Sequence, residues 1–256
     1  MARVDLNCDM GESWGAYTMG DDAAMLDIVT SANVACGFHG GDPLVMHRTL
    51  DLARRKGVNV GAHPSYLDPW GFGRRRFVGE DPADIEKMIV YQVGAIVGMA
   101  RHVGHRIVHV KPHGTLGNAA QEDDALAATI ARTVKAIDPG LILMVMPGGS
   151  LEREGEKAGL RIAREVFADR AYDDRGMLVS RKLPGAVIHD ARLAADNVLR
   201  MVEEGAVISV TGKRVPVAVD TVCVHGDNPA AVAMASELRK TLERAGVNVR
   251  PLDTMA

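Results

Sequence analysis

Short hydrophobic runs alternate with amphipathic stretches along the whole chain. The short runs are rich in Val, Ile, Leu and Ala and predict buried strands at residues 4–8, 32–36, 58–62, 107–111, 141–146, 162–166 and 221–224. Between them, apolar residues recur at helical spacing, as at Ile85, Ile89 and Val93. This alternation of strands and helices predicts a parallel sheet with helices outside it.

The predicted helices carry local start signals. Asp42-Pro43 and Asp81-Pro82 each place an N-cap acid before a proline in the first helical position. We expect helices at 22–29, 43–57, 82–103, 123–137, 151–158, 191–204 and 229–245, with an irregular stretch at 169–184 and a β-hairpin at 207–219. Seven core strands are more than most open sheets need. The pattern therefore predicts one α/β domain over residues 1–256, a seven-stranded β/α barrel of the TIM-like type.

Composition narrows the class of protein. Hydrophobic residues make up 47% and charged residues 25%, as in ordinary soluble domains with a real core. The net charge of -3 and the lack of a basic stripe argue against nucleic acid as a partner. No apolar run approaches the length of a membrane span, and residues 1–5 lead into a strand rather than a signal peptide. Three widely spaced cysteines without a CxxC motif favour a reducing, cytoplasmic location.

Polar side chains gather where the predicted strands end, and in β/α barrels those ends carry the chemistry. The segment HVKPHGTLGN is the clearest case, because His109, Lys111 and His113 share one face of an extended strand. The candidate catalytic residues are Asp9, Glu12, His39, His63, Lys111, His113, Glu165, Asp169 and Arg170. The candidate substrate-binding residues are Asn7, Gly40, Gly41, His225 and Asp227.

Several of these residues also have a structural interpretation. We expect His109 to be a core histidine with its own hydrogen-bond partner. Asp227 serves equally well as an N-cap before Pro229, and the glycines at 40 and 41 form either an anion-binding nest or only a tight turn. Lys111 is harder to explain structurally, because a lysine is seldom buried without a partner.

The residues alone leave two chemistries open. No phosphate-binding GxxxxGK[ST] or GxGxxG motif is present, nor HExxH or GxSxG. The listed acids and histidines can exchange protons near neutral pH, or Asp9, His39 and His63 can hold a divalent metal ion. The pair His109 and His113 is a weaker metal site, because strand geometry places them about 13 Å apart.

Seven segments of the chain, in order and over nearly its full length, resemble the LamB/YcsF family. They are DLNCDMGESWGAYTMGDD (5–22), SANVACGFHGGDP (31–43), GAHPSYLDPWGFGRR (61–75), HVKPHGTLGN (109–118), REVFADRAY (164–172), LPGAVIHD (183–190) and VCVHGDNP (222–229). The resemblance implies a seven-stranded barrel akin to that of carbohydrate deacetylases. One departure is Gly117, which follows Leu116 where the family usually has an aromatic residue.

The resemblance implies that the chain is the A subunit of a prokaryotic 5-oxoprolinase, which works with B and C subunits. That enzyme opens the lactam of 5-oxo-L-proline to L-glutamate with ATP as co-substrate. Under this hypothesis Asp9 or His63 is the base, Lys111 and Arg170 clamp negative charge, and His113 donates a proton. Three questions are left open: which subunit binds ATP, whether a divalent cation is bound, and whether the chain forms a homo-oligomer. The alternatives are a stand-alone metal-dependent amide hydrolase or carbohydrate deacetylase, and a non-catalytic scaffold subunit.

Overall fold

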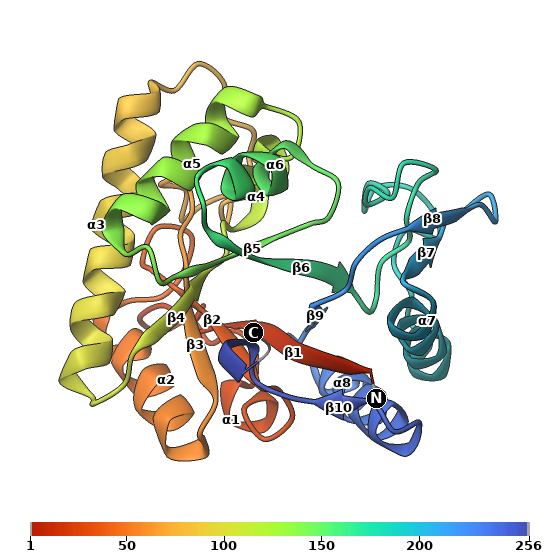
Figure 1. Ribbon diagram of the computed structural model, residues 1–256. Helices are drawn as coiled ribbons and strands as arrows, with labels where there is room; N and C mark the ends of the chain where they lie inside the picture. The colour runs from red at the N-terminus through yellow and green to blue at the C-terminus, as the bar shows by residue number, and fades with distance from the viewer. Residues whose placement is uncertain (1, 255–256) are drawn as a thin grey trace.

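The computed structural model of the chain describes residues 2–254. Seven parallel strands form a closed barrel (Figure 1), because the last of them pairs with both the sixth and the first. They are β1 (Arg3–Met10), β2 (Ser31–Ala35), β3 (Asn59–His63), β4 (Ile107–Val110), β5 (Ile142–Val145), β6 (Arg161–Phe167) and β9 (Thr221–Val224). The predicted seven-stranded barrel is thus confirmed. A two-residue strand that was not predicted, β10 (Asn248–Val249), pairs with the start of β1.

The helices surround this barrel (Figure 1). They are α1 (Asp22–Met25), α2 (Pro43–Lys56), α3 (Pro82–His102), α4 (Gly114–Ala120), α5 (Asp124–Ile137), α6 (Ser150–Lys157), α7 (Ala191–Glu204) and α8 (Pro229–Arg244). Asp42 and Asp81 cap α2 and α3 ahead of a proline, as predicted. Asn228 caps α8, so of the two interpretations of Asp227 the one as N-cap was wrong. The helix predicted at 22–29 is only one turn long, and α4 was not predicted.

The interior of the barrel is polar along β1 and its neighbours β2 and β9. Along β1 the side chains alternate, so that hydrophobic residues pack outward against the helices while Asp5, Asn7 and Asp9 face inward. Asp5 accepts hydrogen bonds from Thr30, Ser31 and Thr221, at 2.7, 2.6 and 2.5 Å. Burial nevertheless raises the pKa of Asp5 to about 6.

The hydrogen-bond network continues from Asp5 toward the carboxyl ends of the strands. Asn7 donates to Thr221 at 2.8 Å and accepts from Asn33 at 2.7 Å. Asn33 also donates to Asp9 at 2.8 Å, and its oxygen lies 2.7 Å from Nε2 of His109. His109 is therefore the buried core histidine that the sequence predicted, with a side-chain partner.

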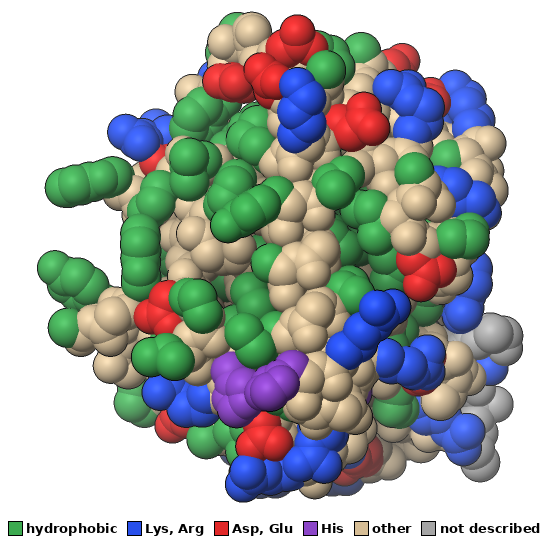
Figure 2. All heavy atoms as spheres, turned by 90° about the vertical axis from the view of Figure 1, so that its left-hand side faces the viewer, with side chains coloured by type: hydrophobic (Ala, Val, Ile, Leu, Met, Phe, Trp, Pro, Cys, Tyr) green, Lys and Arg blue, Asp and Glu red, His purple; other side chains and the backbone are tan. Residues whose placement is uncertain are grey.

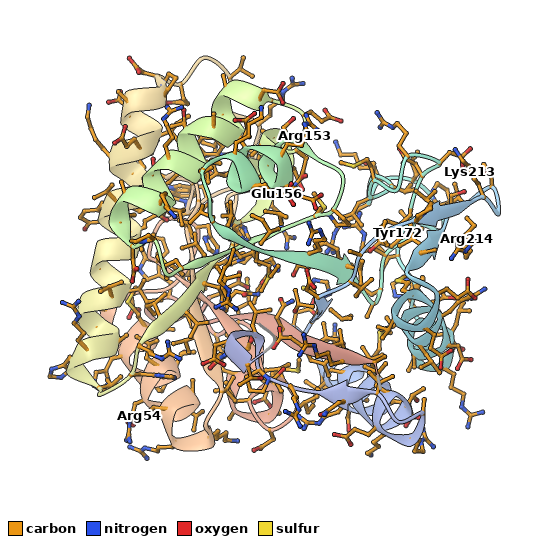
Figure 3. All side chains as sticks on the ribbon, in the orientation of Figure 1. Arg54, Arg153, Glu156, Tyr172, Lys213 and Arg214 are labelled. Atoms are coloured by element: carbon orange, nitrogen blue, oxygen red, sulfur yellow. The ribbon has the colours of Figure 1, made fainter. Side chains whose placement is uncertain are left out.

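The chain leaves the barrel after β6 and forms an irregular segment beside a small antiparallel sheet. This sheet consists of β7 (Ala206–Ile208) and β8 (Arg214–Pro216). In Figure 3, Lys213 and Arg214 lie at its outer end, and Tyr172 lies on the side that faces the barrel. Tyr172 is buried, and its hydroxyl accepts from the backbone N–H of Phe167 at 2.7 Å. This bond fixes the irregular segment to the end of β6.

Hydrophobic side chains are exposed on the side covered by α2 and α3. Figure 2 looks onto this side and shows them gathered on the surface and protruding at one edge. The large exposed hydrophobic residues of these helices and of the loop after β3 are Leu44, Leu67, Trp70, Val78, Val90 and Tyr91. Within residues 2–254, no helix is both long enough and apolar enough to cross a bilayer.

Candidate functional site

Lys111 is a buried cation at the centre of the site. It follows β4 directly, and its Nζ lies 2.9 Å from Oδ1 of Asp9 on β1 and 2.7 Å from Oε1 of Glu165 on β6. Burial opposes the charge, but the neighbouring carboxylates raise the pKa of Lys111 well above its ordinary value. Cys223 Sγ lies 3.5 Å away, and burial raises the pKa of this thiol, which favours the neutral thiol over the thiolate.

Three histidines and a glutamate meet next to Asp9. The rings of His39 and His113 stack with their centroids 3.6 Å apart, and His63 meets both of them edge-on. Glu12 Oε1 lies 3.2 Å from Nε2 of His39 and 3.9 Å from Nδ1 of His113. One donor atom from each of the four residues lies within 4.8 Å of all the others. The cluster of Glu12, His39, His63 and His113 is called the histidine cluster below.

The outer hydrogen bonds of two histidines fix their tautomers. Nδ1 of His63 lies 2.6 Å from the carbonyl oxygen of Lys111, and Nε2 of His113 lies 2.9 Å from that of Phe72. Because a carbonyl only accepts, these nitrogens carry the protons of the neutral rings. Nε2 of His63 and Nδ1 of His113 then direct two lone pairs at each other across 3.0 Å. Such an arrangement requires a shared cation, either a proton or a metal ion.

The charge state of the cluster favours a metal ion. Burial lowers the pKa of His39 and of His113 well below the ordinary histidine value, so both rings are neutral near pH 7. Neutral imidazole is the form that binds metals, and three histidines with one carboxylate suit a first-row ion such as zinc. The sequence predicted Asp9, His39 and His63 for this purpose. In the structure Oδ2 of Asp9 still lies 3.3 Å from Nε2 of His63, but Asp9 is also bound to Lys111 and Asn33. Glu12 and His113 join His39 and His63 as the four residues whose donor atoms lie close together.

A second acid–histidine pair lies at the ends of β6 and β9. Oδ2 of Asp169 is 3.0 Å from Nδ1 of His225, and both side chains are largely buried. Burial lowers the pKa of His225, but the bond to Asp169 outweighs it and raises that pKa overall. Asp169 thus fixes the ring of His225 and leaves Nε2 as the nitrogen available for chemistry.

Two cavities meet at this end of the barrel. The larger measures about 920 Å³ and lies between α1 and the start of α8, lined by residues such as Met19, Met25 and Asp227. The smaller measures about 540 Å³ and contains Lys111, His113, Glu165 and Phe167 in its wall. Four residues line both cavities: Asp9, Arg74, Arg181 and His225. The carboxyl ends of the strands therefore converge as the sequence predicted, around one opening.

Four other predicted site residues mainly bind or pack against the protein itself. Arg170 lines the smaller cavity, but its guanidinium donates to the carbonyls of Val179 at 2.6 Å and Ala186 at 3.4 Å in the irregular segment. Gly40 and Gly41 are buried against the backbone of residues 11–12, where an added Cβ would lie within 3 Å of a carbonyl oxygen. These two glycines allow Glu12 to approach His39, and neither lines a cavity. Asn7 is a buried member of the interior network.

Sequence similarity identifies the family of this chain. The sequence profile of the LamB/YcsF family matches residues 4–256. The chain belongs to the LamB/YcsF family. It is 53% identical to the 5-oxoprolinase A subunit 2 of Bradyrhizobium diazoefficiens over 251 residues, which is 98% of each chain. It is also 53% identical to the 5-oxoprolinase A subunit of Gluconobacter oxydans, over 97% of this chain and 98% of that one.

Solved structures agree with this assignment. The lactam utilization protein of Thermus thermophilus superposes with a TM-score of 0.92 and 46% identity, covering 97% of this chain and 99% of that one. A deacetylase called T48, solved with substrate, superposes with a TM-score of 0.52 at 15% identity, over 98% of this chain and 89% of that one. The second likeness shows only that the LamB/YcsF barrel shares the deacetylase type of fold.

The structure explains what Gly117 does in this LamB/YcsF chain. The residue lies within α4, on the wall of the smaller cavity. A Cβ added there would lie 2.6 Å from the carbonyl oxygen of Pro112. The aromatic residue that the resemblance leads us to expect at this position therefore cannot be accommodated without a local shift of α4 or of Pro112.

Proposed function

We propose that this chain is the A subunit of an ATP-dependent 5-oxoprolinase and hydrolyses the lactam of 5-oxo-L-proline to L-glutamate together with B and C subunits. The proposal is carried by the identity of about half of all residues, over nearly the full length, with relatives named as the A subunit of 5-oxoprolinase. The geometry of the site supports it, because groups for acid–base chemistry and for charge stabilisation line one opening.

The reaction explains why such groups are needed. A five-membered lactam is a stable amide, and its nitrogen leaves only after it is protonated. Phosphorylation of the amide oxygen by ATP would activate the carbon for attack by water. Departure of the protonated nitrogen would then leave an acyl phosphate, and a second water would release inorganic phosphate and L-glutamate. The sequence contains none of the familiar glycine-rich phosphate loops, so we place the ATP site on a partner subunit. In this scheme the A subunit receives the activated lactam.

Each group in the site has a role in this scheme. Asp169 orients His225, whose Nε2 donates the proton to the departing nitrogen. Lys111 holds Asp9 and Glu165 in place and presents a fixed positive charge to the negatively charged oxygens of the activated lactam. The role of charge clamp predicted for Arg170 is not retained, because backbone carbonyls occupy its guanidinium.

The histidine cluster would hold a divalent metal ion through Glu12, His39, His63 and His113. The directed lone pairs of His63 and His113 are the observation that supports this fit. When bound, such an ion supplies Lewis-acid polarisation and lowers the pKa of a coordinated water. The predicted role of His113 as proton donor is replaced here by that of a ligand.

The test is to combine the purified chain with B and C subunits and measure glutamate release from 5-oxoproline. Release should require ATP and all three subunits, and Lys111→Ala and His225→Ala should each reduce it at least about 100-fold. The metal content is measured separately by mass spectrometry. His63→Ala should lose the metal, while His47→Ala, an exposed histidine on α2, should retain it. Full turnover by the Lys111 and His225 variants would leave only a scaffold role.

A stand-alone metal-dependent amide hydrolase is the second candidate, and the histidine cluster is the observation that favours it. Such an enzyme would release product from an acetylated sugar or a simple amide without ATP and without partner subunits. The same preparation decides between the two. ATP-independent deacetylation by the isolated chain would replace the first proposal with the second.

A further inference from the structure

Two arginines at the opening of the site have no counter-ion. Arg74 and Arg181 each line both cavities, and within residues 2–254 neither guanidinium forms an ion pair. Both side chains are exposed. The neighbouring Arg75 behaves differently, because its Nε donates to the buried Asp68 at 2.7 Å. Unpaired arginines on the wall of a cavity are what a site for an anionic ligand provides.

The loop that carries Arg74 is held by internal hydrogen bonds and is attached to the histidine cluster. Asp68 accepts from the N–H of Gly71 at 2.9 Å and closes the turn. Phe72 has a φ of 54°, and its carbonyl accepts from Nε2 of His113 at 2.9 Å. A non-glycine residue in the left-handed region is strained, and such strain persists where surrounding contacts fix it. The guanidinium of Arg74 lies 5.0 Å from the centre of the Phe72 ring, which orients it.

Arg181 reaches the same opening from a different part of the chain, the irregular segment after β6. The positive charge of Arg181 acts to lower the pKa of Asp169 and of His225. That of Arg74 acts to lower the pKa of Glu12 and of His39. Both arginines also act on the buried Arg170, whose pKa is lowered first by burial and then by this like charge. Positive charge thus reaches the opening from two separate segments, and Asp169 does not neutralise it because it is bound to His225.

We propose that Arg74 and Arg181 form a clamp that binds an oxyanion of the substrate across the opening. The inference rests on the proposed function. The lactam substrate offers two such oxyanions, the carboxylate on its ring and the phosphoryl group carried by the activated lactam oxygen. Both present two oxygens to a guanidinium, which binds them through paired charge-assisted hydrogen bonds. The clamp holds the lactam between the histidine cluster and His225.

The experiment uses Arg74→Ala and Arg181→Ala in the reconstituted enzyme, with Arg76→Ala as the matched control. Arg76 belongs to the same arginine triplet and is exposed, but it lines neither cavity. Two substrates are compared: 5-oxoproline and 2-pyrrolidinone, which is the same lactam without the carboxylate. Each clamp variant should lose about 10- to 100-fold in kcat/KM on 5-oxoproline, as the loss of a charged hydrogen bond predicts. Arg74→Lys should recover part of that loss.

The second substrate identifies the oxyanion. If the clamp binds the carboxylate, the variants and the wild type act equally on 2-pyrrolidinone. If it binds the phosphoryl group, both substrates lose the same factor. The clamp is overturned if Arg74→Ala and Arg181→Ala match Arg76→Ala on both substrates.

A binding measurement separates this inference from the proposed function. Isolated wild-type chain and the three variants are titrated with 5-oxoproline and with inorganic phosphate by calorimetry. If the reconstituted enzyme opens no lactam, the proposed function fails. The clamp still stands if wild type and Arg76→Ala bind one of these anions and the clamp variants bind it at least about 10-fold more weakly. Without turnover, equal binding by all four proteins, or binding by none, overturns the clamp.

Discussion

Replacing Lys111 with methionine should destabilise the fold more than any other single change of charge in the site. Methionine has nearly the same length, so the change removes the positive charge and keeps most of the packing. The charge lies 2.9 Å from Asp9 and 2.7 Å from Glu165, and Lys111 and Glu165 are both buried. Removing one partner from a buried ion pair leaves an uncompensated charge and costs about 3–5 kcal/mol. That is a large part of the roughly 5–15 kcal/mol that stabilises a typical domain.

The assay is urea unfolding of the isolated chain near neutral pH, followed by circular dichroism, with the slope m compared between variants. Lys87→Met is the matched control, because Lys87 lies at the same 2.9 Å from Asp84 on the surface of α3. The control should unfold like the wild type, since exposed pairs are screened by water. In Lys111→Met, adding Glu165→Gln should recover about 2 kcal/mol, because it removes one of the unpaired carboxylates.

Two results would refute this account of Lys111. One is a loss of stability in Lys111→Met no larger than in the Lys87 control. The other is a double variant, Lys111→Met with Glu165→Gln, that is no more stable than the single one. Either would mean that water reaches the carboxylates freely and that the lysine is not holding them together.

Three further predictions concern backbone and buried groups, each measured by urea unfolding. The folded pKa of Asp5 is raised from 3.8 to about 6, so protonated Asp5 stabilises the fold fully below about pH 4, and this stabilisation is lost as pH rises through 6. Asp5→Asn does not titrate. Its free energy of unfolding, relative to that of the wild type, should therefore rise by about 2 kcal/mol from about pH 4.5 to about pH 7.5. Gly61→Ala should cost about 2–3 kcal/mol, because its Cβ would lie 2.2 Å from the buried ring of His109. Gly117→Tyr should cost about 1–3 kcal/mol, because its Cβ would lie 2.6 Å from a backbone carbonyl.

The Asp5 prediction is tested by its pH dependence, and the two glycine predictions by comparison with a glycine that has free space around it. If the stability difference between Asp5→Asn and wild type does not change with pH, the pKa of Asp5 is the same in the folded and unfolded states, and the prediction is refuted. Gly94→Ala is the control for both glycine variants, because nothing lies within 4 Å of its added Cβ in α3. It should be neutral or slightly stabilising. A Gly61→Ala protein as stable as Gly94→Ala would mean that His109 can move aside.

The order and type of most elements could be predicted from the sequence because their signals are local. Hydrophobic period and Asp-Pro caps act over a few residues, and they gave the strands and α2 and α3 correctly. The missed elements have weak local signals. Helix α4 contains glycine at positions 114 and 117, and β10 has only two residues. Its pairing with β1 arises only from tertiary structure.

Which residues form the site was harder to predict than where the site lies. Strand ends indicated where the site lies, but the choice of Glu12 over Asp9 for the histidine cluster depends on how the loop after β1 turns against Gly40. The inward turn of Arg170 likewise depends on carbonyls of the irregular segment. For Arg74 and Arg181, charge was the only feature of the sequence that could indicate a place in the site. No periodicity in the sequence relates them, because the barrel brings them together through separate loops.

The closure of the barrel has a consequence for synthesis of the protein. Strand β1 is made first, yet one of its neighbours is β9, and the bond between Asp5 and Thr221 joins positions 216 residues apart. During translation β1 therefore has an unpaired edge until almost the whole polypeptide has left the ribosome. Contacts of such long range fold slowly, and an exposed strand edge favours aggregation in the meantime. We expect the nascent chain to depend on chaperones until its final quarter emerges.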